Sequence, residues 1–490
     1  MKQLVLLAMS LMTFFSIEGS FVSCMNDDDI STSSSDYLSF STDTVAFDTV
    51  ISGQPTNTHT FIVYNKNQKA LHLSRVYLKN GTLSAFRVNV DGTFLENGYG
   101  GDFEIAGRDS MYVFVEMTAP ETNSDFPTEV FDLLTFVTNA GIEQSVTLTA
   151  YGQDVIPLNA ITITKDTILS STRPYQVFDS LVVAPTVNLT LAPGVRLYFH
   201  SESQLIVHGV LHVQGTLNAP VIMRGDRLGN MFSNQPYDRI PGQWGGIIFT
   251  QESFNNIIQY ADIHSARLGI RCDSSDTEKE KLRLENSIVH NMSGDCIQSQ
   301  MSRLFVGNTQ ITNAGGNCVT LYGGHNTFIH CTIGNFYAFT GGRGVALEFS
   351  NEKGDFPFPL QQANFINSII TGYSTDEIMG NQSERYGNSE FNYLFQNCLL
   401  NTPEYEDNRI IDCIWDNNEN TVCRDENFFP AFDLDKLLFT FELNEESRAV
   451  NSANPEISRE FYPTDRKGRS RFLDSAPDMG CYEGVFLEGN

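Results

Sequence analysis

A repeated phrase of short apolar runs between Ile257 and Leu400 constrains the fold of this 490-residue chain more than any other feature. Each copy has alternating apolar residues, a polar step, and then Asn, Ser or Thr before an aliphatic residue. The aliphatic residues that end the copies are spaced 25, 23, 22, 36 and 30 positions apart: Ile263, Ile288, Ile311, Ile333, Ile369 and Leu399. A β-rich period in the low twenties is typical of solenoids, in which each repeat forms one coil.

A polar row follows these aliphatic residues. Two positions after them stand Ser265, His290, Asn313, Asn335, Thr371 and Asn401. Stacked side-chain amides bond from coil to coil and satisfy turn backbone, so the row is predicted to be structural. His264, His290 and His330 fall at offsets of +1, +2 and −3 from the aliphatic residues. They are therefore not expected to share a row or to form a metal or catalytic trio.

The early coils carry phrases of a known fold family. Leu-Ala-Pro-Gly-Val at 191–195, the turn-rich phrase at 209–220 and Gln-Trp-Gly-Gly-Ile-Ile-Phe at 243–249 resemble right-handed parallel β-helix proteins of the pectate-lyase-like superfamily. The resemblance implies an all-β fold, with a right-handed parallel β-helix over residues 160–405 and three short strands in each coil.

The C-terminal residues, 406–490, lose the repeat and are predicted to be irregular. The sequence Ala-Pro-Asp-Met-Gly-Cys-Tyr-Glu at 476–483 resembles the ending of many β-helix proteins of Bacteroidetes, with Met479 and Cys481 as mild departures. This resemblance implies a capping segment that covers the open end of the stack, where unpaired strand edges would otherwise be exposed.

Residues 36–152 read as a separate all-β domain, joined to the coils by a linker at 153–159. About seven alternating strand candidates are separated by turn-like breaks such as Lys79-Asn80-Gly81 and Asn139-Ala140-Gly141. This spacing predicts an immunoglobulin-like β-sandwich. The domain contains neither cysteine nor tryptophan, so an antibody-type core is excluded. A plain spacer is the favoured role.

The N-terminus predicts export and a lipid anchor. Residues 1–23 have the basic start and short apolar run of a signal peptide, too short for a stable membrane span. Phe21-Val22-Ser23-Cys24 resembles a bacterial lipobox, with Phe21 where Leu is usual, and implies lipidation at Cys24. A cleaved signal with an incidental cysteine is the alternative.

Residues 24–35 are expected to form a flexible, serine-rich tether. Their acidic triplet, Asp27-Asp28-Asp29, resembles the export signal of Bacteroidetes surface lipoproteins. The implied location is the outer membrane, facing the cell exterior. A solvated charge run is the alternative.

Charge and cysteine spacing exclude some functions. The chain has 59 acidic and 31 basic residues, a net charge of −28, which argues against nucleic-acid binding. It also disfavours acidic glycans unless a cation bridges them. No two cysteines have C-x-x-C spacing, so a zinc ribbon is not expected. A disulfide between Cys413 and Cys423 is left open.

Known catalytic patterns of the fold are missing. The Arg-x-Pro-x-x-Arg pattern of pectate lyases is absent, and Gly323-Gly324-His325 lacks the carboxylate motifs that accompany the Gly-His-Gly loop of galacturonases. An acidic loop contains Asp273, Asp276, Glu278 and Glu280, whose carboxylates are of the kind that binds Ca²⁺. The Asp and Gly spacing of a calcium-binding loop is missing, so a solvated turn is favoured over a Ca²⁺ site. No catalytic residue and no other cofactor is predicted.

Two insertions, at 226–242 and 350–361, interrupt the repeat. Loops that leave a rigid scaffold often carry binding sites, although tolerated loop length is the alternative. The candidate ligand-binding residues in or beside them are Asp238, Arg239, Trp244, Asp355, Phe356 and Phe358.

The favoured hypothesis is therefore a surface lipoprotein that binds glycan or protein along its β-helix, with an outer-membrane complex as a candidate partner. A divergent polysaccharide lyase or glycoside hydrolase is the alternative.

Overall fold

The computed structural model describes residues 29–232, 235–386, 389–416, 433, 437, 439–484 and 486. Cys24, the signal segment and Cys423 lie outside these residues. Within them the chain is almost entirely β-structure, with one α-helix, α3 (Pro455–Phe461), and two 3-10 turns, η1 (Gly81–Leu83) and η2 (Tyr237–Arg239). In the described part, no helix is both long and apolar enough to cross a bilayer.

The chain divides into two compact units, one built from most of residues 29–151 and the other mainly from residue 152 onward. The first unit has two sheets. The five-stranded sheet contains, in spatial order, β1 (Ser39–Phe40), β3 (His59–Tyr64), β9 (Ser110–Met117), β5 (Phe86–Val90) and β6 (Thr93–Phe94). The six-stranded sheet contains β2 (Thr44–Ile51), β11 (Glu143–Gln153), β10 (Thr128–Thr138), β4 (Leu71–Leu78) and β7 (Tyr99–Gly100), with β8 (Phe103–Ile105) on β4.

Apolar alternation explains why these two sheets pack together. Along β9, every second residue is buried, so one face is apolar. The rings of Phe61 from β3 and Phe136 from β10 meet edge to face, with centroids 6.4 Å apart, and so join the two sheets. Pairs such as β3–β9 and β4–β10 are antiparallel. The unit is an all-β, two-sheet structure; its immunoglobulin-like character stays a prediction.

The second unit contains two long sheets. The 18-stranded sheet comprises β12 (Ile156–Ile163), β14 (Tyr175–Val183), β16 (Arg196–Phe199), β17 (Gln204–Val207), β19 (Val221–Gly225), β22 (Gly246–Phe249), β24 (Ala261–His264), β25 (Ile270–Cys272), β27 (Ile288–Met292), β28 (Ile297–Gln300), β30 (Gln310–Ala314), β31 (Val319–Tyr322), β33 (Thr332–Asn335), β34 (Leu347–Ser350), β38 (Ile369–Gly372), β39 (Ile378–Asn381), β41 (Leu399–Leu400) and β43 (Ile414–Trp415). The 10-stranded sheet comprises β13 (Thr167–Leu169), β15 (Asn188–Leu191), β18 (Val210–Gln214), β23 (Asn256–Gln259), β26 (Leu282–Glu285), β29 (Arg303–Gly307), β32 (Gly324–Ile329), β37 (Leu360–Ile366), β40 (Phe391–Gln396) and β42 (Ile410–Ile411).

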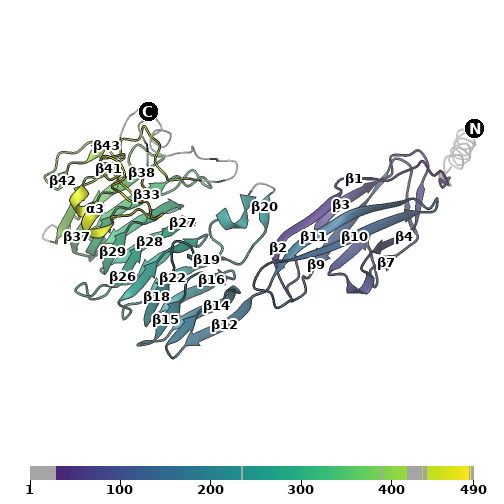
Figure 1. Cartoon of the computed structure of the whole chain (residues 1–490), viewed down its shortest axis with the longest axis horizontal. Helices are drawn as coiled ribbons and strands as arrows, with labels where there is room; N and C mark the ends of the chain where they lie inside the picture. The colour runs from purple at the N-terminus through teal and green to yellow at the C-terminus, as the bar shows by residue number, and fades with distance from the viewer. Residues whose placement is uncertain are drawn as a thin grey trace, which may run out of the picture. The chain divides into compact units, whose positions relative to one another are not determined.

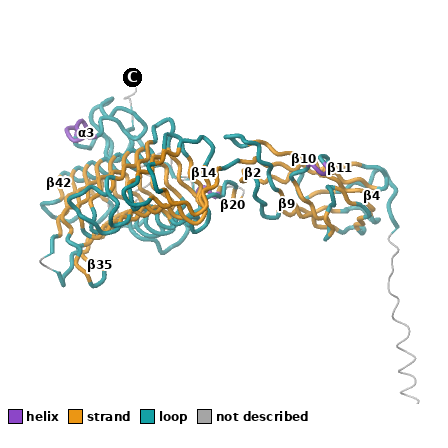
Figure 2. Tube along the Cα trace, turned by 90° about the horizontal axis from the view of Figure 1, so that it is seen from below, coloured by secondary structure: helices purple, strands orange, loops and turns teal. Residues whose placement is uncertain are grey.

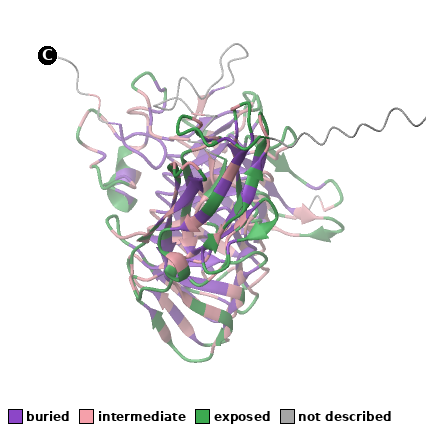
Figure 3. Cartoon of the chain, turned by 90° about the vertical axis from the view of Figure 1, so that its right-hand side faces the viewer, coloured by how far each residue is buried: buried purple, intermediate pink, exposed green. Residues whose placement is uncertain are grey.

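These strands stack as coils (Figures 1 and 2). The strands β26, β27 and β28 of one coil pair in parallel with β23, β24 and β25 of the coil before it. The next coil, β29 to β31, repeats the arrangement. Alternate side chains point into one continuous core, and Figure 3 shows buried and exposed residues alternating along the strands. The predicted parallel β-helix is confirmed.

The strand register corrects the alignment of coils that the sequence suggested. Ile263 pairs with Val289, and Val289 pairs with Ile311, so Val289 rather than Ile288 is the inward residue of its coil. The inward residues are likewise Ile370 and Leu400 rather than the residues before them. Each pair of neighbouring apolar residues left the choice open, and a one-residue slip exchanges the two faces of a strand.

Asparagine recurs where several coils turn out of a strand in the left-handed region. Asn286, Asn308, Asn367 and Asn397 have φ between 49° and 54°. Asparagine tolerates this conformation better than most side chains, because its short amide bonds locally. A second left-handed row holds Ser265, Asn291 and Asn313. The predicted structural role of Asn313 and Asn335 is retained, since Asn335 accepts from the Ala314 amide at 3.1 Å and Asn313 from the Phe336 amide at 3.2 Å.

The C-terminal segment lies along the flank of the coils. The hydroxyl of Tyr462 donates to Glu285 at 2.7 Å, and the hydroxyl of Tyr482 donates to Gln310 at 2.7 Å. Arg448 reaches the carbonyl of Trp415 in the last strand, β43. The segment therefore covers the side of several coils as well as meeting the end of the stack.

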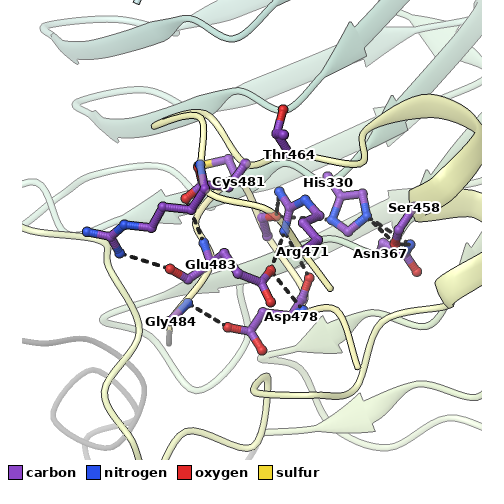
Figure 4. Close-up of polar contacts among 12 residues, drawn as sticks. His330, Asn367, Ser458, Thr464, Arg471, Asp478, Cys481, Glu483 and Gly484 are labelled. Atoms are coloured by element: carbon purple, nitrogen blue, oxygen red, sulfur yellow. Dashed lines mark hydrogen bonds and ion pairs between the residues drawn. The ribbon is translucent and has the colours of Figure 1, made fainter. Parts of the chain in front are cut away.

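A buried polar cluster fastens this segment (Figure 4). The guanidinium of Arg471 is fully buried; it donates to the carboxyl group of Glu483 at 3.1 Å and to the amide oxygen of Asn308 at 2.8 Å. His330 contacts the Ser458 hydroxyl at 2.8 Å. Burial lowers the pKa of His330 well below its usual range, and Arg471 lowers it further. His330 is thus a neutral structural group.

Two hairpins leave the coils at the predicted insertions. They are β20 (Asn230–Phe232) with β21 (Gln235–Pro236), and β35 (Glu352–Lys353) with β36 (Phe356–Pro357).

Candidate functional site

A polar row on the outer face of the 18-stranded sheet forms the candidate site. His264 on β24 pairs with His290 on β27, and His290 pairs with Thr312 on β30. The expectation that His264 and His290 do not share a row is therefore wrong. It failed because Ile288, taken as the inward residue, is one position out of register. His330 lies elsewhere, under the C-terminal segment, as its offset indicated.

Asp262 links the two histidines. It stands two residues before His264 on β24, so both side chains point to the same face of the strand. Oδ1 of Asp262 lies 2.8 Å from Nδ1 of His264 and 3.0 Å from Nε2 of His290. The two imidazole centroids are 4.9 Å apart. A ligand atom from each of the three residues lies within 4.8 Å of the other two.

Asp238, on η2 in the first insertion, completes the cluster. Its Oδ1 lies 2.8 Å from Nε2 of His264 and 2.5 Å from the guanidinium of Arg224. The hydroxyl of Ser265 donates to the Asp238 carbonyl oxygen at 2.7 Å. The insertion is thus held on the sheet by charge and by backbone contact. We name Asp238, Asp262, His264 and His290 the Asp-His cluster.

The electrostatics of the cluster favour charge separation. Burial disfavours the His264 cation, but Asp262 and Asp238 outweigh burial and raise the pKa of His264 to about 9. Burial likewise opposes ionisation of Asp238, yet His264 and Arg224 lower its pKa to about 2. Burial also opposes ionisation of Asp262, but His264 and His290 outweigh burial and hold the pKa of Asp262 well below its usual range. At neutral pH a histidine cation therefore lies between two carboxylates.

A cavity of about 330 Å³ opens beside the cluster. Its floor is the strand face that carries Asp262, His290 and Thr312. Its other side is formed by the first insertion, through Arg239, and by the C-terminal segment. The residues from that segment are Leu437, Phe439, Thr440, Phe441, Glu442, Lys467 and Tyr482. The cavity thus has a floor with carboxylate and imidazole groups, and its other side carries aromatic and polar side chains.

Two of the three candidate residues in or beside the first insertion lie at the Asp-His cluster or its cavity. Asp238 enters the Asp-His cluster, and Arg239 lines the cavity. Trp244 does not: it is fully buried, its ring stacks on Phe199 with centroids 4.1 Å apart, and its Nε1 donates to the His264 carbonyl at 2.8 Å. The expectation of a ligand contact at Trp244 is corrected to a supporting role beneath His264.

The second insertion lies apart from the cavity. Asp355 is exposed and forms an ion pair with Arg385 at 2.5 Å. Phe356 is 69% exposed on β36, and the Phe358 amide donates to the Asn351 carbonyl at 2.8 Å. None of these three residues belongs to the Asp-His cluster or lines its cavity.

The acidic loop at 273–280 holds its charges in local pairs. Asp273 contacts Arg271 at 3.0 Å, and Glu280 contacts Arg283 at 2.8 Å. Asp276 lies 3.6 Å from Lys279. This arrangement is that of a solvated, ion-paired turn.

A second cavity, of about 320 Å³, lies near the last coils. Its walls include Phe349, Phe395 and Leu400, which belong to the central core, and Arg409, which stacks on Tyr393 at 3.9 Å. This cavity is an extension of the apolar core at the end of the stack and holds no cluster comparable with the Asp-His cluster among its described residues.

Comparisons with known proteins leave the function open. No protein-family model and no curated protein matches the chain. The catalytic unit of a thermostable GH87 α-1,3-glucanase from Streptomyces thermodiastaticus aligns over 73% of this chain and 75% of its own, with 11% identity and a TM-score of 0.26. A Porphyromonas gingivalis protein of unknown function aligns over 26% and 60%, with 11% identity and a TM-score of 0.17.

Another solved structure also matches only part of the chain. The Escherichia coli chaperone DraB aligns over 24% of this chain, with 12% identity and a TM-score of 0.17, and the chain spans 55% of its length. TM-scores this low transfer neither a fold nor an activity. The β-helix is therefore established by the strand pairing of this chain itself.

Proposed function

We propose that the chain is a lipoprotein of the bacterial outer membrane that faces the cell exterior and binds a neutral glycan in the cavity beside the Asp-His cluster. The observation that carries the binding proposal is the composition of the cavity wall. Asp262, Gln310 and Thr312 supply carboxylate, amide and hydroxyl groups, and Phe439 and Tyr482 supply aromatic rings.

The wall matches the chemistry of a sugar. A sugar ring presents hydroxyl groups that both donate and accept hydrogen bonds, and apolar C–H faces that pack on aromatic rings. A cavity of about 330 Å³ lies at the small end of the range for ligand sites, roughly 300–1,000 Å³. It therefore suits a terminal residue or short end of a glycan. The net charge of −28 disfavours a polyanionic glycan.

Glycan-binding tests use the full chain in detergent on an array of neutral glycans. Thr440→Trp fills the cavity from its rim and is expected to weaken binding at least tenfold while leaving the melting temperature unchanged. Glu445→Trp, on the exposed surface of the same segment, is the matched control and should bind like the wild type. If Thr440→Trp and the wild type bound glycan equally well, the cavity would not be the glycan-binding site.

A glycosidase is the competing function, because Asp262 and Glu442 both line the cavity. Such an enzyme needs one carboxyl group that donates a proton. Although burial opposes it, the neighbouring histidines keep the pKa of Asp262 well below its usual range, so this carboxylate does not act as the acid. New reducing ends on incubation with a bound glycan would favour the enzyme over the binding protein.

The anchoring proposal rests on the lipobox-like sequence that ends at Cys24. Cys24→Ala is expected to move the protein from the outer-membrane fraction to the soluble fraction. Protease added to intact cells should degrade the wild-type protein. An unchanged distribution of Cys24→Ala, or protection from added protease, would contradict anchoring or surface exposure respectively.

A further inference from the structure

The Asp-His cluster places two imidazoles and a carboxylate at one point on the rim of the cavity. We propose that Asp262, His264 and His290 bind a divalent zinc ion, with one coordination position open to the cavity.

The three side chains have the chemistry that zinc prefers. Zinc is bound in proteins by histidine nitrogens and carboxylate oxygens, and sites with three protein ligands keep the fourth position for water or another ligand. Bonds of roughly 2.0–2.1 Å in a tetrahedral site place neighbouring ligand atoms roughly 3.3 Å apart. The Asp262 oxygen lies 2.8 Å and 3.0 Å from the two histidine nitrogens, and all three ligand atoms lie within 4.8 Å. The two Asp–His separations therefore need to change by a few tenths of an ångström, and the separation of the two histidine nitrogens by no more than about 1.5 Å.

Asp238 supplies the supporting contact that metal-bound histidines usually have. Such a histidine donates its other ring N–H to a carboxylate, which fixes the ring and its tautomer. With zinc on Nδ1 of His264, Nε2–H donates to Asp238, which already lies 2.8 Å away. The Asp238 carboxylate is itself fixed by Arg224 at 2.5 Å. Zinc replaces the Nδ1 proton of His264, and that proton leaves to solvent.

The cluster lies where an ion can reach it from solvent and where one side of the bound ion faces the cavity. The His264 side chain is 5% exposed, whereas those of Asp262 and His290 are 32% and 23% exposed. Asp262 and His290 line the cavity, so the fourth position faces it. The floor of the site is rigid, because Trp244 donates to the carbonyl of His264 from the core.

Zinc binding does not depend on the proposed glycan function and is measured without glycan. The full chain in detergent is dialysed against a chelator and titrated with Zn²⁺ in competition with a chromophoric chelator. One zinc ion per chain is expected. His290→Asn should weaken binding at least 100-fold, and Asp238→Asn, which touches only the supporting contact, 10–100-fold. His212→Asn, on β18 of the other sheet, is the matched control and should bind like the wild type.

Cobalt gives a second readout that does not require a variant. Co²⁺ substitution should produce visible absorption of a four- or five-coordinate ion with nitrogen and oxygen ligands, and no sulfur charge-transfer band. Absence of stoichiometric Zn²⁺ uptake would overturn the proposal. Unchanged affinity in His290→Asn, or a sulfur band with Co²⁺, would also overturn it.

Discussion

His264 and His290 occupy the same position on consecutive coils, with ring centroids 4.9 Å apart, although 26 residues separate them in the sequence. The parallel register alone brings them together, because each coil repeats the position of the one beneath it. The first insertion adds Asp238, whose Oδ1 lies 2.8 Å from Nε2 of His264. The site is thus built from two coils and one loop, all held on a rigid stack.

Removing Asp238 should release the first insertion from the sheet. Asp238→Ala deletes the acceptor for His264 and Arg224 and leaves both largely buried cations with less compensation. The local cost is expected to be about 1–3 kcal/mol, because Asp238 is itself partly exposed. Trypsin should then cleave after Arg227 or Arg239 at least tenfold faster than in the wild type.

The control for this change is Asp276→Ala, which removes an exposed acidic residue from an unrelated turn. It should leave the cleavage rate unchanged. If Asp238→Ala also left the rate unchanged, the contacts of Asp238 would not be what holds the insertion.

The architecture was predictable because the same apolar phrase recurs every 22 to 36 residues along the coils. The position of His290 relative to His264 was not predictable, because Ile288 and Val289 are both apolar and the sequence alone does not say which of them faces the core. Val289 is fully buried and Ile288 is not. Had Val289 been chosen, the alignment would have placed His290 directly above His264.

Trp244 shows a different limit of sequence analysis. Tryptophan beside an insertion suggests a ligand contact, but only packing reveals that its ring stacks on Phe199 inside the stack. Asp262 and His264 carried a usable signal: a carboxylate and an imidazole two residues apart lie on one face of a strand. The walls contributed by Phe439 and Tyr482 could not be predicted, since nothing in their sequence tells which coils they contact.

Gly246 should be among the least replaceable glycines of the coils. Its φ is 103°, and an added Cβ would lie 1.6 Å from the Leu268 carbonyl oxygen. Gly246→Ala therefore requires backbone movement between two coils and should cost on the order of 3 kcal/mol or more. Gly341→Ala is the matched control, because a Cβ there meets nothing within 4 Å. Urea unfolding should show a lowered midpoint for Gly246→Ala alone; equal midpoints would contradict the close approach of the coils.

Cys413 should be the most reactive of the seven described cysteines. The other six are buried, whereas Cys413 is partly exposed and is a free thiol. A hydrogen bond with Cys398 lowers the pKa of Cys413, while burial raises the pKa of Cys398. Because the thiolate is the reactive form, iodoacetamide should modify Cys413 before the other six described cysteines under native conditions. Peptide mapping by mass spectrometry checks the order, and prior labelling of Cys398 or Cys481 would contradict it.

The buried carboxyl groups around Arg471 should make the C-terminal segment less stable at high pH. Burial raises the pKa of Glu483 to about 8 and that of Asp478 to about 6, above the usual value of about 4. The folded segment therefore binds more protons than the unfolded one. Its stability is fully present below pH 4 and is lost as pH rises through 6 and 8. From pH 5 to pH 9, the free energy of unfolding is expected to fall by on the order of 5 kcal/mol.

Glu483→Gln tests the source of this pH dependence, because it keeps the shape of the side chain and removes its titration. Its melting temperature should fall less between pH 5 and pH 9 than that of the wild type. Glu445→Gln, at an exposed site of the same segment, should retain the wild-type slope. Stability that rises with pH over this range, or an equal slope in Glu483→Gln, would show that Glu483 is ionised throughout and that its 3.1 Å contact with Arg471 outweighs burial.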